Sequence, residues 1–143
     1  MFYCVYDITT HELTYATAGH PPALLFTDTP EGGTTPVRLT APNMFIGCVD
    51  DYPYQKASIT LTGPSRLYTF SDGVYEIRLE DDSIWEFDEF ESFMSQGKEH
   101  GLAKMDALFS HCQTLGNATI LDDDFSILEV SFAVEGANGE ESQ

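Results

Sequence analysis

The chain has 143 residues, 42% of them hydrophobic and 13% aromatic, which predicts one globular domain with a packed core. It carries 24 acidic residues against 6 Lys and Arg, giving a net charge of −18, so nucleic acid and anionic membrane surfaces would both repel it. Such acidity serves solubility or favours basic partners and cations. The sequence has 3 cysteines without paired spacing, no membrane-length apolar run and no signal peptide, so we expect a cytoplasmic protein without disulfides.

The first half of the chain predicts a series of strands. Residues 2–8 are nearly all apolar, which is typical of a strand buried on both faces. Leu13, Tyr15 and Thr17 alternate with other residues and predict the return strand. Further strands are expected at 23–26, 37–39, 55–61 and 66–70, with Pro- and Gly-rich turns at 28–35 and 63–65.

The second half predicts two helices and a closing strand. Apolar residues recur at helical spacing in two groups: Phe87, Phe90, Phe93 and Met94, then Leu102, Met105, Leu108, Cys112 and Leu115. Gly97 would end the first helix, and Gly116 is a candidate cap for the second. Residues 125–132 are apolar on both faces, which predicts a central strand. Strands followed by two helices and another strand form an α+β pattern.

Three short segments carry the candidate chemistry. Residues 15–22 read Tyr-Ala-Thr-Ala-Gly-His-Pro-Pro, a strand that runs into a stiff loop. Residues 70–76 read Phe-Ser-Asp-Gly-Val-Tyr-Glu, where a strand breaks and Gly73 lets the backbone turn sharply. Residues 122–128 read Asp-Asp-Asp-Phe-Ser-Ile-Leu, a group of carboxylates before a strand. Carboxylates fixed at strand ends are the oxygen ligands that hard divalent cations need.

In this order the three segments resemble the second part of the SpoIIE-like branch of the metal-dependent serine/threonine phosphatases. That family reads roughly Tyr-Ala-Asn-Ala-Gly-His-Pro-Pro, then Thr-Asp-Gly-Val-x-Glu, then Asp-Asp-x-Thr/Ser before a final strand. The resemblance covers about residues 3–132 and implies the type 2C fold, an antiparallel β-sandwich flanked by helices. The family's first strands, first metal-binding motif and long helix pair lie before the point matched by Met1. We therefore expect residues 1–134 to be the later part of a phosphatase domain, and residues 135–143 to be a disordered tail.

The resemblance implies that Asp72 and Asp123 are the catalytic carboxylates and that, with Asp124, they bind two Mn²⁺ or Mg²⁺ ions. Two such ions neutralise a phosphate ester and lower the pKa of a bridging water. An ordinary solvated turn is the alternative for each aspartate. His20 would lie in an active-site loop, although a structural histidine bonded to a neighbouring loop fits the sequence equally well.

Other acidic and reactive residues are interpreted more simply. For Asp122 a solvated turn is preferred, and Glu76 matches an acidic position of the family but is interpreted as surface charge. Cys48 is followed by acidic residues where a cysteine phosphatase needs Arg, so that class is excluded. The sequence contains neither a Gly-x-Ser-x-Gly elbow nor a Gly-Lys-Ser/Thr phosphate loop.

The resemblance implies a phosphatase module of bacterial signal transduction, acting on a phosphoprotein such as an anti-sigma-factor antagonist in a partner-switching system. An attached sensor or response-regulator receiver domain is expected. The isolated chain is expected to be inactive, because the family's first metal-binding aspartate would lie upstream. The alternative is a catalytically incomplete protein-binding module. An open apolar face at Phe2, Cys4, Tyr6 and Ile8 further predicts self-association.

Overall fold

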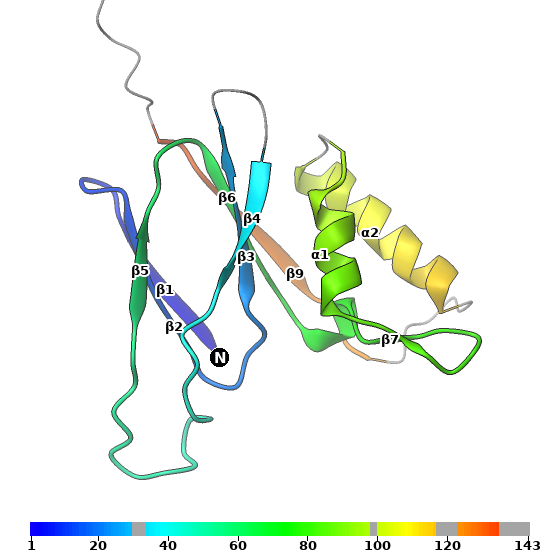
Figure 1. Ribbon diagram of the computed structural model, residues 1–143, viewed down its shortest axis with the longest axis horizontal. Helices are drawn as coiled ribbons and strands as arrows, with labels where there is room; N and C mark the ends of the chain where they lie inside the picture. The colour runs from blue at the N-terminus through cyan, green and yellow to red at the C-terminus, as the bar shows by residue number, and fades with distance from the viewer. Residues whose placement is uncertain (30–33, 98–99, 117–122, 135–143) are drawn as a thin grey trace, which may run out of the picture. The chain divides into compact units, whose positions relative to one another are not determined.

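The computed structural model describes residues 1–29, 34–97, 100–116 and 123–134. Two compact units make up the chain, one with Met1–Leu67 and the residues from Val130 on, the other with Tyr68–Glu129. In order, the strands and helices are β1 (Phe2–Asp7), β2 (Glu12–Thr17), β3 (Ala23–Asp28), β4 (Thr34–Leu39), β5 (Ala57–Thr60), β6 (Ser65–Phe70), a 3₁₀ helix (Asp72–Val74), β7 (Ile77–Arg78), β8 (Ile84–Trp85), α1 (Phe87–Ser95), α2 (Gly101–Leu115) and β9 (Ile127–Phe132). Figure 1 labels β1–β7, β9, α1 and α2.

Two larger sheets are present, and their strands confirm the pattern predicted for the first half of the chain. One sheet has the order β1-β2-β5 with antiparallel pairing, and Leu13 lies opposite Ile59. The other has the order β4-β3-β6-β9, with β3 and β4 antiparallel and Ala23 opposite Leu39. Strands β6 and β9 each continue from one unit into the other. The remaining pair, β7 with β8, is a short antiparallel hairpin.

The core of the first unit forms from alternate residues of these strands. Leu13, Tyr15 and Thr17 are all buried, as their spacing predicted, because successive side chains of a strand point to opposite faces. Leu13 and Tyr15 belong to one cluster with residues of the other sheet, notably Leu25, Leu39 and Leu67. The two sheets of this unit therefore pack face to face in a β-sandwich.

Strand β1 differs from its prediction. Among the described residues it is an edge strand, and its residues alternate between half-buried and exposed, so burial on both faces was wrong. Of the face expected to lie open, Phe2, Cys4 and Tyr6 are partly buried against the core cluster, whereas Ile8 is 79% exposed as expected. On the opposite face, Tyr3 is 60% exposed and Val5 is 52% exposed. An apolar run alone cannot reveal whether a second layer covers each face of its sheet.

The second unit contains both predicted helices, packed beside each other (Figure 1). Phe90 and Met94 of α1 are buried, and Gly97 adopts a φ of 75°, the left-handed conformation that commonly follows a helix end. The prediction failed at the start of α2, where Leu102 is 79% exposed. Lys104 takes the buried position, together with the predicted Leu108 and Cys112.

Buried Lys104 has a clear structural role in this unit. Its ammonium donates hydrogen bonds to the backbone carbonyls of Phe93 at 2.8 Å and of Gln96 at 2.7 Å. The Nζ atom of Lys104 also lies 4.8 Å from the centre of the Phe93 ring. The last carbonyls of a helix have no partner within it, so Lys104 supplies one for the end of α1.

Two further features differ from the sequence predictions. Strand β9 is an edge strand in the described part of its sheet, and Leu128 is 58% exposed, so its central placement was wrong. The β7–β8 hairpin was missed, although the Asp81–Ser83 turn, with Asp82 at a φ of 64°, is a recognisable signal. The predicted tail at 135–143 lies outside the described residues. No helix in the described ranges is long and apolar enough to span a membrane.

Candidate functional site

The second and third candidate segments lie against each other in the second unit. The Ser71 hydroxyl donates a 2.6 Å hydrogen bond to the backbone carbonyl of Asp124, from a position 53 residues earlier. The Ser71 backbone N–H donates to the Ser126 carbonyl at 2.9 Å. The Ser126 backbone N–H in turn donates to the Ser71 hydroxyl at 3.0 Å. These bonds fix the end of β6 beside the start of β9.

Gly73 allows this close approach through its missing side chain. A Cβ atom at Gly73 would lie 2.6 Å from the Asp124 carbonyl oxygen and 3.2 Å from the Asp123 Cβ atom. The chain turns sharply here as a 3₁₀ helix over residues 72–74, and Gly73 does so without a positive φ. The glycine is therefore required by contact with the acidic segment rather than by backbone conformation.

Asp72 and Asp123 both present exposed carboxylates on these adjoining segments. One oxygen of Asp72 accepts a hydrogen bond from the Gly73 N–H at 3.1 Å. One oxygen of Asp123 accepts from the Asp124 N–H at 2.7 Å. Each carboxylate is thus oriented by the amide that follows it. Among the described residues, no Lys or Arg forms an ion pair with either carboxylate.

The electrostatic environment of this turn is negative. Burial raises the pKa of the Tyr75 hydroxyl, and the charges of Glu76 and Asp72 raise it further. Cys112 lies under the same turn, and its thiol donates to the Val74 carbonyl at 3.5 Å. Burial raises the pKa of this thiol to about 11, so it is a neutral packing group rather than a nucleophile.

The donors fit Mn²⁺ or Mg²⁺ in kind, because carboxylate oxygens are the ligands that these hard ions prefer. The number of donors is smaller than a complete site needs. Within the described ranges, no group of three or more His, Cys, Asp or Glu residues is arranged to hold a metal ion. Asp122, the first aspartate of the run, lies outside those ranges.

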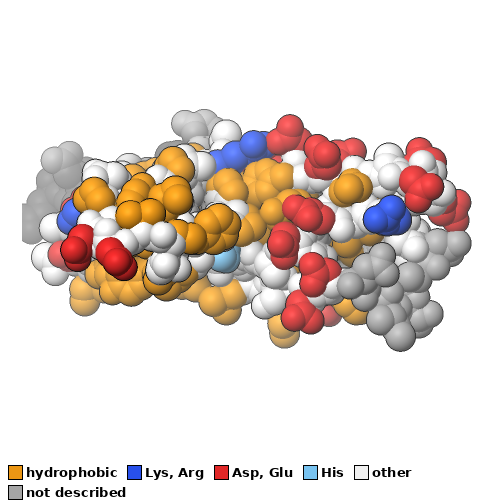
Figure 2. Space-filling view, turned by 90° about the horizontal axis from the view of Figure 1, so that it is seen from below, with side chains coloured by type: hydrophobic (Ala, Val, Ile, Leu, Met, Phe, Trp, Pro, Cys, Tyr) orange, Lys and Arg blue, Asp and Glu red, His pale blue; other side chains and the backbone are white. Residues whose placement is uncertain are grey.

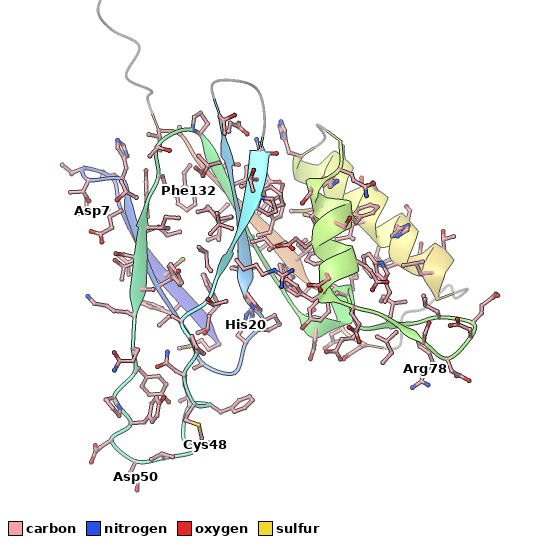
Figure 3. All side chains as sticks on the ribbon, viewed as in Figure 1. Asp7, His20, Cys48, Asp50, Arg78 and Phe132 are labelled. Carbon is pink, nitrogen blue, oxygen red and sulfur yellow. The ribbon has the colours of Figure 1, made fainter. Side chains whose placement is uncertain are left out.

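His20 belongs to the first unit, in the loop between β2 and β3 that is labelled in Figure 3. Its Nδ1 atom lies 2.9 Å from the Pro21 carbonyl oxygen, and its ring centre is 6.2 Å from that of Phe2. These local contacts are of the type expected for a structural histidine. Its role in an active-site loop near the candidate aspartates stays a prediction.

Ser71 is the residue that sequence reasoning missed. Its hydroxyl both donates to and accepts from the third segment, so it connects the two groups of carboxylates. A serine beside an Asp-Gly turn was a visible signal, but its partners could not be inferred because they lie more than 50 positions away.

Comparison with known proteins shows which family this chain resembles. The model of the family described as Stage II sporulation protein E (SpoIIE) matches residues 1–133. The phosphoserine phosphatase RsbU of Bacillus subtilis is 35% identical over 80 residues, covering 56% of this chain and 23% of RsbU. The chain thus spans less than a quarter of that relative.

Solved structures show the same fold. The SpoIIE phosphatase domain of Bacillus subtilis, Mn presoaked, gives a TM-score of 0.67 at 16% identity, covering 94% of this chain and 56% of the other. The SiaA-PP2C domain of Pseudomonas aeruginosa gives 0.68 at 19% identity, covering 88% of this chain and 48% of the other. The predicted α+β architecture of the type 2C phosphatases is therefore confirmed, and the chain spans about half of each solved domain.

Proposed function

The chain belongs to the SpoIIE family, and from this premise we propose that it is part of a metal-dependent protein serine/threonine phosphatase domain in bacterial signalling. The main support is the hydrogen bonding between Ser71 and the segment at Asp124 and Ser126, which holds two acidic segments together. If these aspartates only formed solvated turns, there would be no reason for Ser71 to hold the two acidic segments together. The similarity to the phosphoserine phosphatase RsbU supports the same activity.

In this proposal Asp72 and Asp123, with Asp124, hold Mn²⁺ or Mg²⁺. The ions supply charge neutralisation of the phosphate and a water of lowered pKa. The protein's own contribution is orientation, because each carboxylate is held by a following amide and the two segments are fixed by Ser71. The Mn-presoaked form of the similar SpoIIE phosphatase domain favours Mn²⁺ as the first ion to test.

We extend the proposal to the partners. The substrate is a cytoplasmic phosphoprotein, for example an anti-sigma-factor antagonist in a partner-switching system, and the complete protein carries a sensor or receiver domain. Residues 1–134 are the part of the phosphatase domain present in this sequence. Strand β1 supports self-association, because it pairs only with β2 in the described part of its sheet and exposes Tyr3 and Val5.

A catalytically incomplete binding module is the second candidate function. It is favoured by the small number of metal donors among the described residues, since no group of three potential ligands occurs there. In that case the acidic segments would hold a partner protein without hydrolysing its phosphate. The two candidates differ in whether Mn²⁺ binds at Asp72 and Asp123.

The test combines Mn²⁺ binding, followed by electron paramagnetic resonance, with hydrolysis of p-nitrophenyl phosphate. We expect this chain to bind Mn²⁺ weakly and to hydrolyse the ester poorly. Asp72→Asn and Asp123→Asn should each weaken Mn²⁺ binding, whereas Asp106→Asn, an exposed position on α2, should not. Equal Mn²⁺ affinity in all four proteins would overturn the metal site. Rapid Mn²⁺-dependent turnover by the chain alone would refute its inactivity and exclude the binding-module alternative.

A further inference from the structure

The second unit contains a surface pocket of about 310 Å³, lined by Tyr75, Glu76, Ile84, Glu86 and Phe87. Its volume is at the lower end of the range for ligand-binding pockets. The lining comes from the turn after the 3₁₀ helix, from β8 and from the start of α1. Three separate elements therefore build this pocket.

Two aromatic rings form one wall of the pocket. The rings of Tyr75 and Phe87 are 5.3 Å apart and nearly perpendicular, at 79°. Both also contact Phe70, whose ring centre is 6.1 Å from Tyr75 and 5.9 Å from Phe87. Packing against the buried Phe70 holds these rings in place. Aromatic rings attract cations through their electron-rich faces.

Glu76 and Glu86 add two carboxylates to the lining, and no Lys or Arg among the described residues contributes to it. Glu86 is the N-cap of α1, and its side chain is held in a capping box with Glu89. Glu76 is exposed and has no hydrogen bond or ion pair to another side chain among the described residues. Figure 2 shows acidic side chains gathered over the visible face of this unit. The pocket thus combines an aromatic wall with a negative rim.

We propose that this pocket binds a Lys or Arg side chain of the phosphoprotein substrate, so that preferred substrates carry a basic residue near the phosphorylated Ser or Thr. This inference rests on the proposed function. Charge complementarity selects the occupant, because carboxylates beside aromatic rings favour an organic cation and repel an acidic segment. The net charge of −18 acts in the same direction.

The pocket also lies next to the candidate metal ligands. The backbone N–H groups of Tyr75 and Glu76 both donate to the Asp72 carbonyl at 2.9 Å. The first lining residues therefore follow Asp72 within one turn of the chain. A substrate whose phosphate lies at Asp72 can place a nearby basic side chain between Glu76 and Phe87.

The test uses the ¹⁵N-labelled chain without metal and two unphosphorylated peptides, followed by NMR. One peptide is acetyl-Gly-Ser-Gly-Arg-Gly-amide, and the other has norleucine in place of Arg. We expect the Arg peptide alone to shift the amide signals of Glu76 and Phe87 in a saturable manner at millimolar concentration. Glu76→Gln should weaken this binding about twofold to fivefold, the range for an exposed charge pair. Glu12→Gln, an exposed glutamate of β2, is the matched control and should leave the affinity unchanged.

A second variant, Phe87→Leu, removes one aromatic ring and keeps both carboxylates, and it should also weaken binding of the Arg peptide. Equal shifts with the norleucine peptide, equal losses in the two Gln variants, or no saturable shift would each overturn the proposal. Because neither peptide is phosphorylated and no metal is present, failure of Mn²⁺ binding or of hydrolysis would leave this result intact. The outcomes for the pocket and for the phosphatase activity are therefore independent.

Discussion

Ser71 and Asp124, 53 positions apart, are joined by a 2.6 Å hydrogen bond from the serine hydroxyl to the aspartate backbone carbonyl. The same hydroxyl accepts the backbone N–H of Ser126 at 3.0 Å. The Ser71 hydroxyl, as both donor and acceptor, therefore connects the end of β6 to the start of β9. The relative position of the two candidate metal-binding segments depends on it.

Ser71→Ala should loosen this connection. It removes every hydrogen bond of the Ser71 hydroxyl, to Asp124 and to Ser126, and should lower the free energy of unfolding by about 1–3 kcal/mol. If the metal proposal holds, Mn²⁺ affinity should fall by about tenfold, as for other groups that orient metal ligands. Ser110→Ala is the control, because the Ser110 hydroxyl bonds only one helical turn back, to the Asp106 carbonyl. Urea unfolding and Mn²⁺ titration of both variants measure the effect, and equal behaviour would contradict the role of Ser71.

Gly73→Ala tests the close approach of the same segments. The added methyl group would meet the Asp124 carbonyl oxygen at 2.6 Å, so the acidic segment must move. Overpacking of this kind should cost about 1–3 kcal/mol of stability. Gly116→Ala is a matched control, since its Cβ would meet its nearest neighbours at 3.6 Å without a positive φ. Thermal unfolding should therefore separate the two variants, and a neutral Gly73→Ala would refute the steric argument.

The sequence predicted those features that depend on local pattern. Alternation in residues 13–17 identified the buried face of β2, because burial of one face imposes a period of two. Features that depend on neighbours distant in the chain were missed or wrong. The apolar runs of β1 and β9 could not show that both are edge strands in the described sheets.

Lys104 and Ser71 show that single side chains, too, can have roles that local sequence pattern does not predict. Lys104 is buried on α2 where Leu102 was expected, because it bonds to carbonyls at the end of another helix. Of the candidate site, the two acidic segments were found by motif, whereas Ser71 was not. Its hydrogen-bond partners become visible only when β6 and β9 are placed side by side.

Lys104→Met should destabilise the second unit although it replaces a charge with an apolar side chain of similar length. The carbonyls of Phe93 and Gln96 would each lose the Lys104 donor, and Phe93 would keep only the Gln96 N–H at 3.2 Å, at a cost of about 1–3 kcal/mol. Lys56→Met, at an exposed position before β5, should change stability by less than about 0.5 kcal/mol. Chemical denaturation compares the two variants. Similar midpoints would show that the α1 end does not need Lys104.

Self-association through β1 is expected at moderate ionic strength, where salt screens repulsion beyond roughly 10 Å. Val5→Lys places a charge on the exposed face of this edge strand and should shift the chain toward monomer in sedimentation velocity. Val37→Lys makes the same change on β4, an edge strand of the other described sheet, and should not shift the chain toward monomer. A monomeric unmodified chain, or equal effects of both variants, would contradict an interface at β1.

A second apolar surface complicates that experiment and calls for its own control. The long loop between β4 and β5, where Figure 3 labels Cys48 and Asp50, exposes Phe45, Ile46 and Val49. The side chain of Asn43 fixes the base of this loop. Its amide nitrogen donates to the Gln55 carbonyl at 2.9 Å, and its amide oxygen accepts the Gln55 backbone N–H at 2.7 Å. Phe45→Ser should leave the sedimentation coefficient unchanged if β1 is the interface. A change toward monomer in this variant would place the contact on the loop instead.

Cys112 should make stability depend on pH in alkaline solution. Burial raises the pKa of its thiol from 9.0 to about 11, so above pH 9 the unfolded chain releases this proton before the folded protein does. The stabilising contribution is therefore complete below pH 9 and is lost as the pH rises to about 11. The difference in free energy of unfolding between the unmodified chain and Cys112→Ala should shrink across that interval. Cys48→Ala, which removes an exposed thiol, controls for general alkaline effects. Urea unfolding at several pH values provides the measurement, and parallel profiles for the unmodified chain and Cys112→Ala would show that the thiol stays protonated in both states or ionises without penalty.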